Sequence, residues 1–302
     1  MKAFQGYLAI TIIRILSLLP LGWAQAFGRA TGAVLFRAGG SVRRIGDVNL
    51  SLCFPQISAG ERLQQVRAAC ENTAMTFAEL GLMWARPPAD GLASIREVHG
   101  DDLLQAALDK GRGILLLAPH LGNWELANTY IADRCQLTAM YRPARNPVFD
   151  RWMHGRREQT GATLVPTTVA GIKALYRSLK DGGVVGFLPD QEPQRDGGEF
   201  VPFMGINALT PRLPHQILQR TGATALFIFA RRLPDGRGFA IHFVAPPEDI
   251  YSADTGLALT AMNDGVAECI RHCPEQYQWL YKRFKRQPVG GTHYYRKTAA
   301  LH

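Results

Sequence analysis

The sequence predicts an α/β fold, a single layered domain in which helices flank a largely parallel or mixed sheet. Apolar runs of strand length recur along the chain, and stretches with helical periodicity lie between most of them. Such an alternation of strands with helices is typical of a layered α/β domain. No internal repeat or long linker divides the chain, so we expect one domain. The expected strands are 113–118, 137–141, 162–165, 184–188, 224–230 and 239–244.

The expected helices fill most of the intervals between these strands. Residues 61–84 place apolar side chains at steps of three and four, which indicates an amphipathic helix, and the following Pro87 and Pro88 end it. The other expected helices are 101–110, 123–134, 147–159, 171–180, 211–221 and 255–273.

Composition and charge indicate that the protein binds an acidic partner. The chain has 302 residues, 47% of them hydrophobic, and a formal net charge of +9. This charge favours an anionic membrane, a phosphorylated lipid, an acidic carrier protein or nucleic acid. The arginines are scattered and no recognition motif is present, so we expect no nucleic-acid partner. The five cysteines include no Cys-x-x-Cys pair, which argues against a disulfide framework and a metal site.

The N-terminal region carries an apolar run of about the length that a bilayer requires, residues 7–28. Arg14 and Pro20 interrupt it, so the segment either spans the membrane or lies on its surface. A secretory signal is the alternative, since Ala24-Gln25-Ala26 resembles a cleavage site, although Arg14 lies within the apolar stretch.

Positive charge follows this run and favours the cytoplasmic side of a membrane. We therefore expect residues 1–30 to form a membrane anchor or interfacial helix, and residues 31–302 to form a body that faces the cytoplasm. The arginines concerned are Arg29, Arg37, Arg43 and Arg44.

A histidine and a glutamate stand five positions apart in the segment His120-Leu-Gly-Asn-Trp-Glu125. They would not share a face of one unbroken helix, so we expect the helix to begin between them, with Gly122 in a turn and Asn123 as the cap. Glu125 would then reach back to the imidazole of His120, which would serve as a general base. The alternative is that both residues merely cap a helix.

Polar residues also follow other expected strands. Arg142 follows the strand at 137–141, and Asp190 follows the strand at 184–188. Because active sites of layered α/β folds lie at the carboxyl ends of strands, we expect these side chains to converge with His120 on one rim.

Several segments, taken in order over nearly the whole chain, carry a resemblance to a known family. They are PHLGNWE at 119–125, YRPARNPVFD at 141–150, RREQTG at 156–161, GFLPDQEP at 186–193, FVPFMG at 200–205 and PEQYQWLYKRFK at 274–285. In these segments the sequence resembles the late lipid A biosynthesis acyltransferases, the lauroyl and myristoyl transferases, within the wider glycerolipid acyltransferase group marked by His-x4-Asp/Glu. We expect an inner-membrane location from this resemblance.

The resemblance implies that residues 31–302 form an acyltransferase domain with a glycerolipid-acyltransferase-like fold. It implies transfer of a fatty acyl chain from acyl carrier protein to a hydroxyl of a lipid A precursor. His120 would deprotonate that hydroxyl while Glu125 holds the ring, and no metal or cofactor would be needed. The same chemistry on another lipid or a polyene, and a non-catalytic membrane lipid-binding protein, remain the alternatives.

Five further residues are candidates for contact with the substrate: Asn123, Arg142, Asn146, Arg157 and Asp190. Arg142 would hold a phosphate or a developing oxyanion. Asn146 precedes Pro147, so helix capping is the alternative role. Arg157 stands near a helix end, where it would also favour the helix dipole. Asp190 would orient an arginine or a substrate sugar, or form a structural ion pair.

Overall fold

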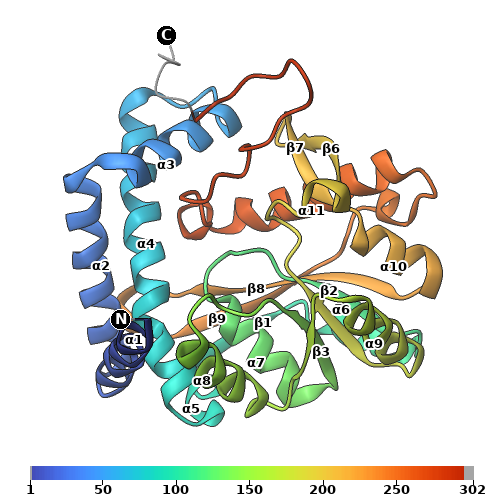
Figure 1. The fold of residues 1–302 in the computed structure, drawn as a ribbon, viewed down its shortest axis with the longest axis horizontal. Coiled ribbons are helices and arrows are strands. Elements are labelled where there is room, and N and C mark those ends of the chain that lie inside the picture. Colours follow the sequence, from blue (N-terminus) through green and yellow to red (C-terminus); the bar gives the residue numbers. More distant parts are fainter. Residues whose placement is uncertain (1, 296–302) are drawn as a thin grey trace.

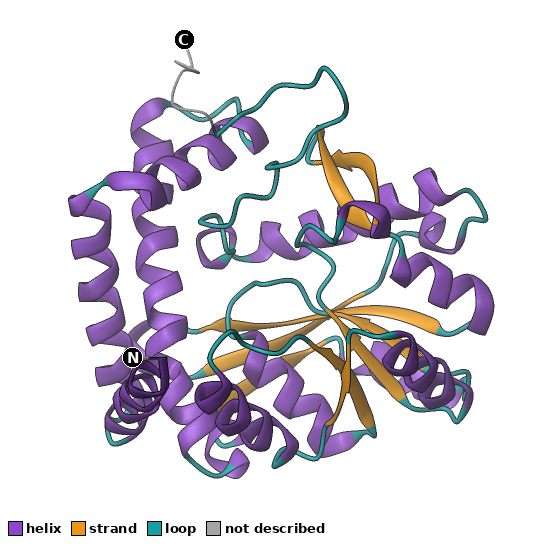
Figure 2. Cartoon of the chain, viewed as in Figure 1, coloured by secondary structure: helices purple, strands orange, loops and turns teal. Residues whose placement is uncertain are grey.

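A mixed sheet forms the centre of the molecule (Figures 1 and 2). The computed structural model describes residues 2–295, apart from the side chain of Lys2. Within the seven-stranded sheet of this part, neighbouring strands pair in parallel, except for the antiparallel pair of β8 (Thr224–Arg232) and β9 (Phe239–Val244). The predicted α/β class with a largely parallel or mixed sheet is confirmed. The strand order is β1 (Ile95–His99), β9 (Phe239–Val244), β8 (Thr224–Arg232), β2 (Ile114–Leu117), β5 (Val184–Phe187), β3 (Leu137–Tyr141) and β4 (Thr163–Pro166).

Helices cover both faces of the sheet, which explains why its central strands are continuously apolar. Ile114 and Leu116 of β2 pack on one face with α6 (Asp101–Asp109), α7 (Trp124–Arg134) and α8 (Pro147–Glu158). Leu115 and Leu117 pack on the other face with α9 (Val169–Lys180), α10 (Leu213–Thr221) and α11 (Thr255–His272). The expected helices 61–84, 101–110, 123–134, 147–159, 171–180, 211–221 and 255–273 are all present with small changes at their ends.

The structure adds elements that the sequence pattern did not indicate. The edge strand β1 has a mostly exposed, polar sequence, so it lacks the apolar run of a buried strand. A hairpin of β6 (Gly198–Phe203) and β7 (Ile206–Pro211) stands apart from the main sheet. Two more helices are α3 (Gly40–Cys53) and α5 (Pro88–Leu92), and short 3-10 turns lie at Arg195–Gly197, Pro234–Gly236, Glu248–Tyr251 and Pro274–Gln276.

The apolar N-terminal run is divided at Pro20 into α1 (Lys2–Ser17) and α2 (Leu21–Ala38). Among residues 2–295, no helix combines the length and apolarity needed to cross a bilayer. Both helices pack against the long helix α4 (Ala59–Ala85), and α1 also packs against α8. Large apolar side chains nevertheless remain exposed on them and on the turn between them, namely Phe4, Tyr7, Leu8, Ile12, Ile15, Leu18, Trp23, Phe27, Val34 and Leu35.

Glycines allow α2 to lie directly on the backbone of α4. A Cβ atom at Gly28 would lie 2.5 Å from the Cα of Met75, and one at Gly32 would lie 2.4 Å from the Cα of Glu71. Real Cβ contacts are not this short, so any larger residue at either position must push the two helices apart.

We predict that Gly32→Ala lowers the melting temperature, because the added methyl group would overpack this interface at a cost of about 1–3 kcal/mol. The matched control is Gly155→Ala in α8, where a new Cβ meets no atom within 4 Å. It should leave the melting temperature unchanged or slightly raise it, since alanine favours a helix over glycine. Equal melting temperatures for both variants, measured by thermal denaturation, would contradict the close packing of α2 on α4.

Candidate active site

His120 and Asp190 meet because they follow neighbouring strands at the same offset. The register of β2 and β5 pairs Leu117 with Phe187, and each polar residue comes three positions later. The amide of Ala118 also donates to the carbonyl of Phe187, which keeps the two chains together beyond the sheet. The two side chains therefore face each other at the carboxyl edge, where α/β folds place their chemistry.

The carboxylate of Asp190 contacts His120 twice. Its Oδ2 accepts from the His120 amide at 2.9 Å, and its Oδ1 lies 2.8 Å from Nδ1 of the ring. Burial alone would raise the pKa of Asp190, but the charge and hydrogen bonds of His120, together with the charge of Arg283, hold it below its ordinary value. When the imidazole is neutral, an ionised carboxylate requires its proton on Nδ1, which leaves the lone pair on Nε2.

The Nε2 side of the ring points toward a polar, partly open environment. Nε2 lies 3.1 Å from Nε2 of Gln191, which also donates to Gln278 Oε1 at 3.0 Å. The ring of Trp124 packs at 5.0 Å, and 13% of the His120 side chain stays accessible. The ring is therefore neither sealed in the core nor free in solvent, which suits a base that must receive a proton from a substrate.

Backbone contacts fix the loop that carries His120. The amide of Asn123 donates to the carbonyl of Ala230, and the amide of Gln278 donates to the carbonyl of His120. Gly122 has a φ of +60°, and a Cβ there would lie 2.0 Å from the Ala230 oxygen. Only glycine fits this position. The predicted turn at Gly122, the cap at Asn123 and the helix start before Glu125 are all confirmed.

Glu125 does not contact the imidazole of His120, so the predicted partner of Glu125 is wrong. Across residues 2–295, its carboxylate pairs with Arg157 through two hydrogen bonds, one of them at 3.0 Å, and accepts from Trp84 at 3.0 Å. Once α7 begins at Trp124, the Glu125 side chain leaves its first turn toward α4 and α8. Asp190, expected to orient an arginine or a sugar, takes the position beside the ring.

The pair of Glu125 and Arg157 is mostly enclosed. The exposed fractions of the two side chains are 6% and 29%. Burial opposes ionisation of Glu125, but Arg157 and the hydrogen bonds of Trp84 and Trp124 more than offset it, so its pKa lies below the ordinary value. Burial likewise disfavours the charge of Arg157, and Glu125 raises its pKa again. Arg157 thus remains a cation close to the His120 loop.

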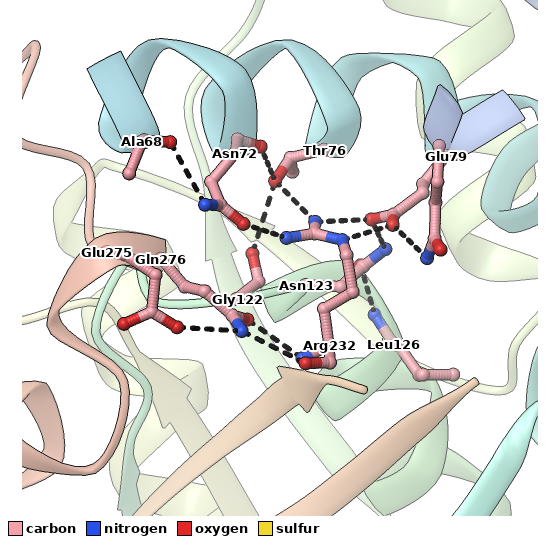
Figure 3. A network of polar contacts seen from close by, with 11 residues as sticks. Ala68, Asn72, Thr76, Glu79, Gly122, Asn123, Leu126, Arg232, Glu275 and Gln276 are labelled. Atoms are coloured by element: carbon pink, nitrogen blue, oxygen red, sulfur yellow. Dashed lines mark hydrogen bonds and ion pairs between the residues drawn. The ribbon is translucent and has the colours of Figure 1, made fainter. Parts of the chain in front are cut away.

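A second buried ion pair supports the same loop (Figure 3). Arg232, at the end of β8, forms two hydrogen bonds with Glu79 of α4, and both side chains are at most 4% exposed. The same carboxylate accepts from Asn123 at 3.0 Å and from Gln25 of α2 at 2.8 Å. The N-terminal helix α2 is therefore joined to the cap of α7 through one carboxylate, a connection that the sequence pattern did not suggest.

The remaining candidate residues lie in different environments. Asn123 is 1% exposed and uses its amide for Leu126 and Glu79. Asn146 caps α8 by accepting from the amides of Val148 and Phe149. Arg142 is exposed after β3, as expected, and lines a cavity of about 580 Å³.

This cavity adjoins the segment that carries Asp190. Leu188 and Glu192, which stand on either side of Asp190 in the sequence, are among the residues that line it. The neighbouring walls include Met140 at the end of β3 and Phe187 at the end of β5. A space of this size with apolar walls and a few charged groups is typical of a ligand site. In the described part of the chain, no group of three or more His, Cys, Asp or Glu is placed to hold a metal ion.

Comparisons with known proteins identify the family to which the chain belongs. A family model described as bacterial lipid A biosynthesis acyltransferase matches residues 1–286. The lipid A biosynthesis palmitoleoyltransferase of Escherichia coli (strain K12) is 32% identical over 251 residues, 82% of this chain and 80% of that protein. The lauroyltransferase of the same strain is 30% identical over 94% of this chain and 92% of its own length. Its myristoyltransferase is 26% identical over 98% and 91%.

The chain is therefore an acyltransferase enzyme. It belongs to the bacterial lipid A biosynthesis acyltransferase family, and the resemblance seen in the sequence is confirmed.

We predict that Asp190→Asn lowers kcat by roughly 10²- to 10⁴-fold with little change in KM, since the amide can no longer favour the Nδ1–H tautomer or stabilise an imidazolium. Acyl transfer by the purified enzyme measures this effect. Asp181→Asn, the same chemical change at an exposed position, is the matched control and should transfer normally. An Asp190→Asn enzyme as fast as the control would remove Asp190 from the mechanism.

Proposed function

We propose that this enzyme transfers a fatty acyl chain from the thioester of acyl carrier protein to a hydroxyl of a lipid A precursor, with His120 as the general base. The observation that carries the proposal is the imidazole at the carboxyl edge of the sheet, bonded through Nδ1 to the buried carboxylate of Asp190 at 2.8 Å. This arrangement presents the basic Nε2 toward the partly accessible side of the ring.

The reaction follows from that tautomer. The acceptor hydroxyl displaces Gln191 from Nε2 and gives its proton to the ring as its oxygen attacks the thioester carbonyl. Asp190 stabilises the resulting imidazolium. The tetrahedral intermediate then collapses, the bond from carbon to sulfur breaks, and the imidazolium returns the proton to the carrier thiolate. The backbone amides at the start of α7, which begins four residues after His120, would stabilise the developing oxyanion.

The cations near the loop give the proposed acceptor its binding groups. Arg142 is exposed beside the 580 Å³ cavity, and Arg157 keeps 29% of its side chain accessible while Glu125 holds it. We assign both guanidiniums to phosphate or oxyanion recognition, which their planar donors suit. Glu125 then acts by placing Arg157. Asn123 and Asn146 contribute by capping α7 and α8, the helices that carry Glu125 and Arg157.

We propose that the enzyme acts at the cytoplasmic surface of the inner membrane, and the surface of the N-terminal helices supports this location. Exposed apolar side chains such as Phe4, Ile15 and Trp23 (71%, 58% and 72% accessible) would enter the lipid interface. The exposed cations Arg29 and Arg37 would meet anionic headgroups. In this arrangement α1 and α2 lie along the membrane surface, and the lipid acceptor reaches the enzyme from that side.

We predict that cells producing the wild-type enzyme contain a lipid one acyl chain heavier than the matching lipid of cells without it, and that His120→Ala abolishes this product. Mass spectrometry of total lipids reports the donor length and the acceptor together, which the differing acyl groups in the relatives' names leave open. A folded His120→Ala enzyme that still forms the product would refute the general-base role. A mass shift on a lipid other than lipid A would refute the acceptor.

A double-mutant cycle tests whether Glu125 acts through Arg157. Glu125→Gln and Arg157→Gln should each slow transfer. The double variant should be about as slow as either single one, because the first substitution already removes the joint contribution of two residues that act as a unit. Transfer rates and melting temperatures of all four enzymes provide the measurement. Losses that multiply in the double variant would show that Glu125 and Arg157 contribute separately.

A further inference from the structure

A cavity of about 400 Å³ lies between α1 and α8, apart from the histidine loop. Its walls come from one side of α1 and from the first turns of α8. Most of the lining side chains are apolar or aromatic, and the volume is within the range of small-ligand sites, about 300–1,000 Å³. The lining residues are Tyr7, Ile10, Arg14, Pro147, Val148, Arg151 and Trp152.

Two guanidiniums line this otherwise apolar space. Arg14 of α1 and Arg151 of α8 are both exposed. Throughout residues 2–295, neither side chain has an ion-pair or hydrogen-bond partner. Two unpaired cations at one apolar cavity favour a ligand that combines a negative charge with a hydrocarbon part.

The adjacent surface indicates where such a ligand comes from. Tyr7, Ile10 and Arg14 recur at helical steps on the side of α1 that faces α8. Another stripe of α1 exposes Leu8, Ile12 and other large apolar side chains. The cavity is thus bordered by the surface that would enter the lipid interface, so a lipid could place a chain in it without leaving the membrane.

We propose that the α1–α8 cavity binds one acyl chain of an anionic glycerophospholipid of the membrane, with the lipid phosphate between Arg14 and Arg151. This inference rests on the proposed membrane placement of α1. The bound lipid is not the reacting acceptor, because the cavity is lined by no residue of the loops that carry His120 and Asp190, whereas Leu188 and Glu192 of the Asp190 loop line the 580 Å³ cavity.

The site has a physical connection to the active site. The ring of Trp152 packs against that of Trp84 at 6.2 Å, and Trp84 donates to Glu125. A lipid chain against Trp152 would also fill the space between α1 and α8, the helix that supplies Arg157. The lipid would therefore hold α8 in the position in which Arg157 and Glu125 meet.

Native mass spectrometry of the full-length protein tests the site. The protein is exposed to vesicles of equal parts phosphatidylcholine and phosphatidylglycerol and then released in mild detergent. Wild-type protein should retain one phosphatidylglycerol, and it should retain no lipid from pure phosphatidylcholine. Arg14→Gln/Arg151→Gln should reduce retention about thirtyfold, since each of the two cations near an anionic lipid contributes on the order of 1 kcal/mol. Ile10→Phe should also lose the lipid, because the larger ring fills the cavity.

The controls separate this site from general charge and from catalysis. Lys173→Gln/Arg177→Gln removes two exposed charges from α9 and should retain the lipid like wild type. His120→Ala should also retain it, so failure of the catalytic proposal would leave this result unchanged. Equal losses in the α9 and α1–α8 variants, retention of phosphatidylcholine, or displacement of phosphatidylglycerol by a stoichiometric phosphorylated lipid A precursor would each overturn the proposal.

Discussion

The hydrogen bond between Asp190 and Nδ1 of His120 is the contact on which the proposed active site depends. It exists because β2 and β5 are neighbours in register, so that two loops leave the sheet side by side. The same carboxylate also accepts from the His120 amide, and it therefore fixes the loop and the ring together. Its depressed pKa keeps it ionised at neutral pH, and an ionised partner selects the tautomer that a general base requires.

Two buried ion pairs position the elements around that bond. Glu79 and Arg232 join α4 to the end of β8 and also hold Asn123, while Glu125 and Arg157 join α7 to α8. Buried pairs of this kind contribute little net stability, but removal of one partner leaves a costly unpaired charge. Their effect is to specify one arrangement of the helices around the His120 loop. Because Gln25 also bonds to Glu79, the arrangement extends to the N-terminal helices.

Local features of this site could be predicted from the sequence, whereas its partners could not. The apolar runs of β2, β3 and β5 and the cap at Asn123 are local signals, and the structure confirms them. The contact of His120 with Asp190 depends on which strands are adjacent, and the sequence pattern does not give strand order. The sequence pattern favours His120 as the partner of Glu125, because the two residues are close in the chain. The actual partner, Arg157, lies on another helix, α8. The edge strand β1 lacks an apolar run because its side chains are mostly exposed.

The general-base role of His120 depends on which ring nitrogen carries the proton, and this can be measured. Nitrogen-15 NMR of histidine-labelled enzyme, with His120 assigned by comparison with His120→Gln, distinguishes the two tautomers of the neutral ring. We predict that the neutral ring carries its proton on Nδ1 and a free lone pair on Nε2. We also predict that Asp190→Asn weakens this preference. A neutral ring with its proton on Nε2 in the wild-type enzyme would contradict the assignment of Asp190 as its partner and of His120 as the base.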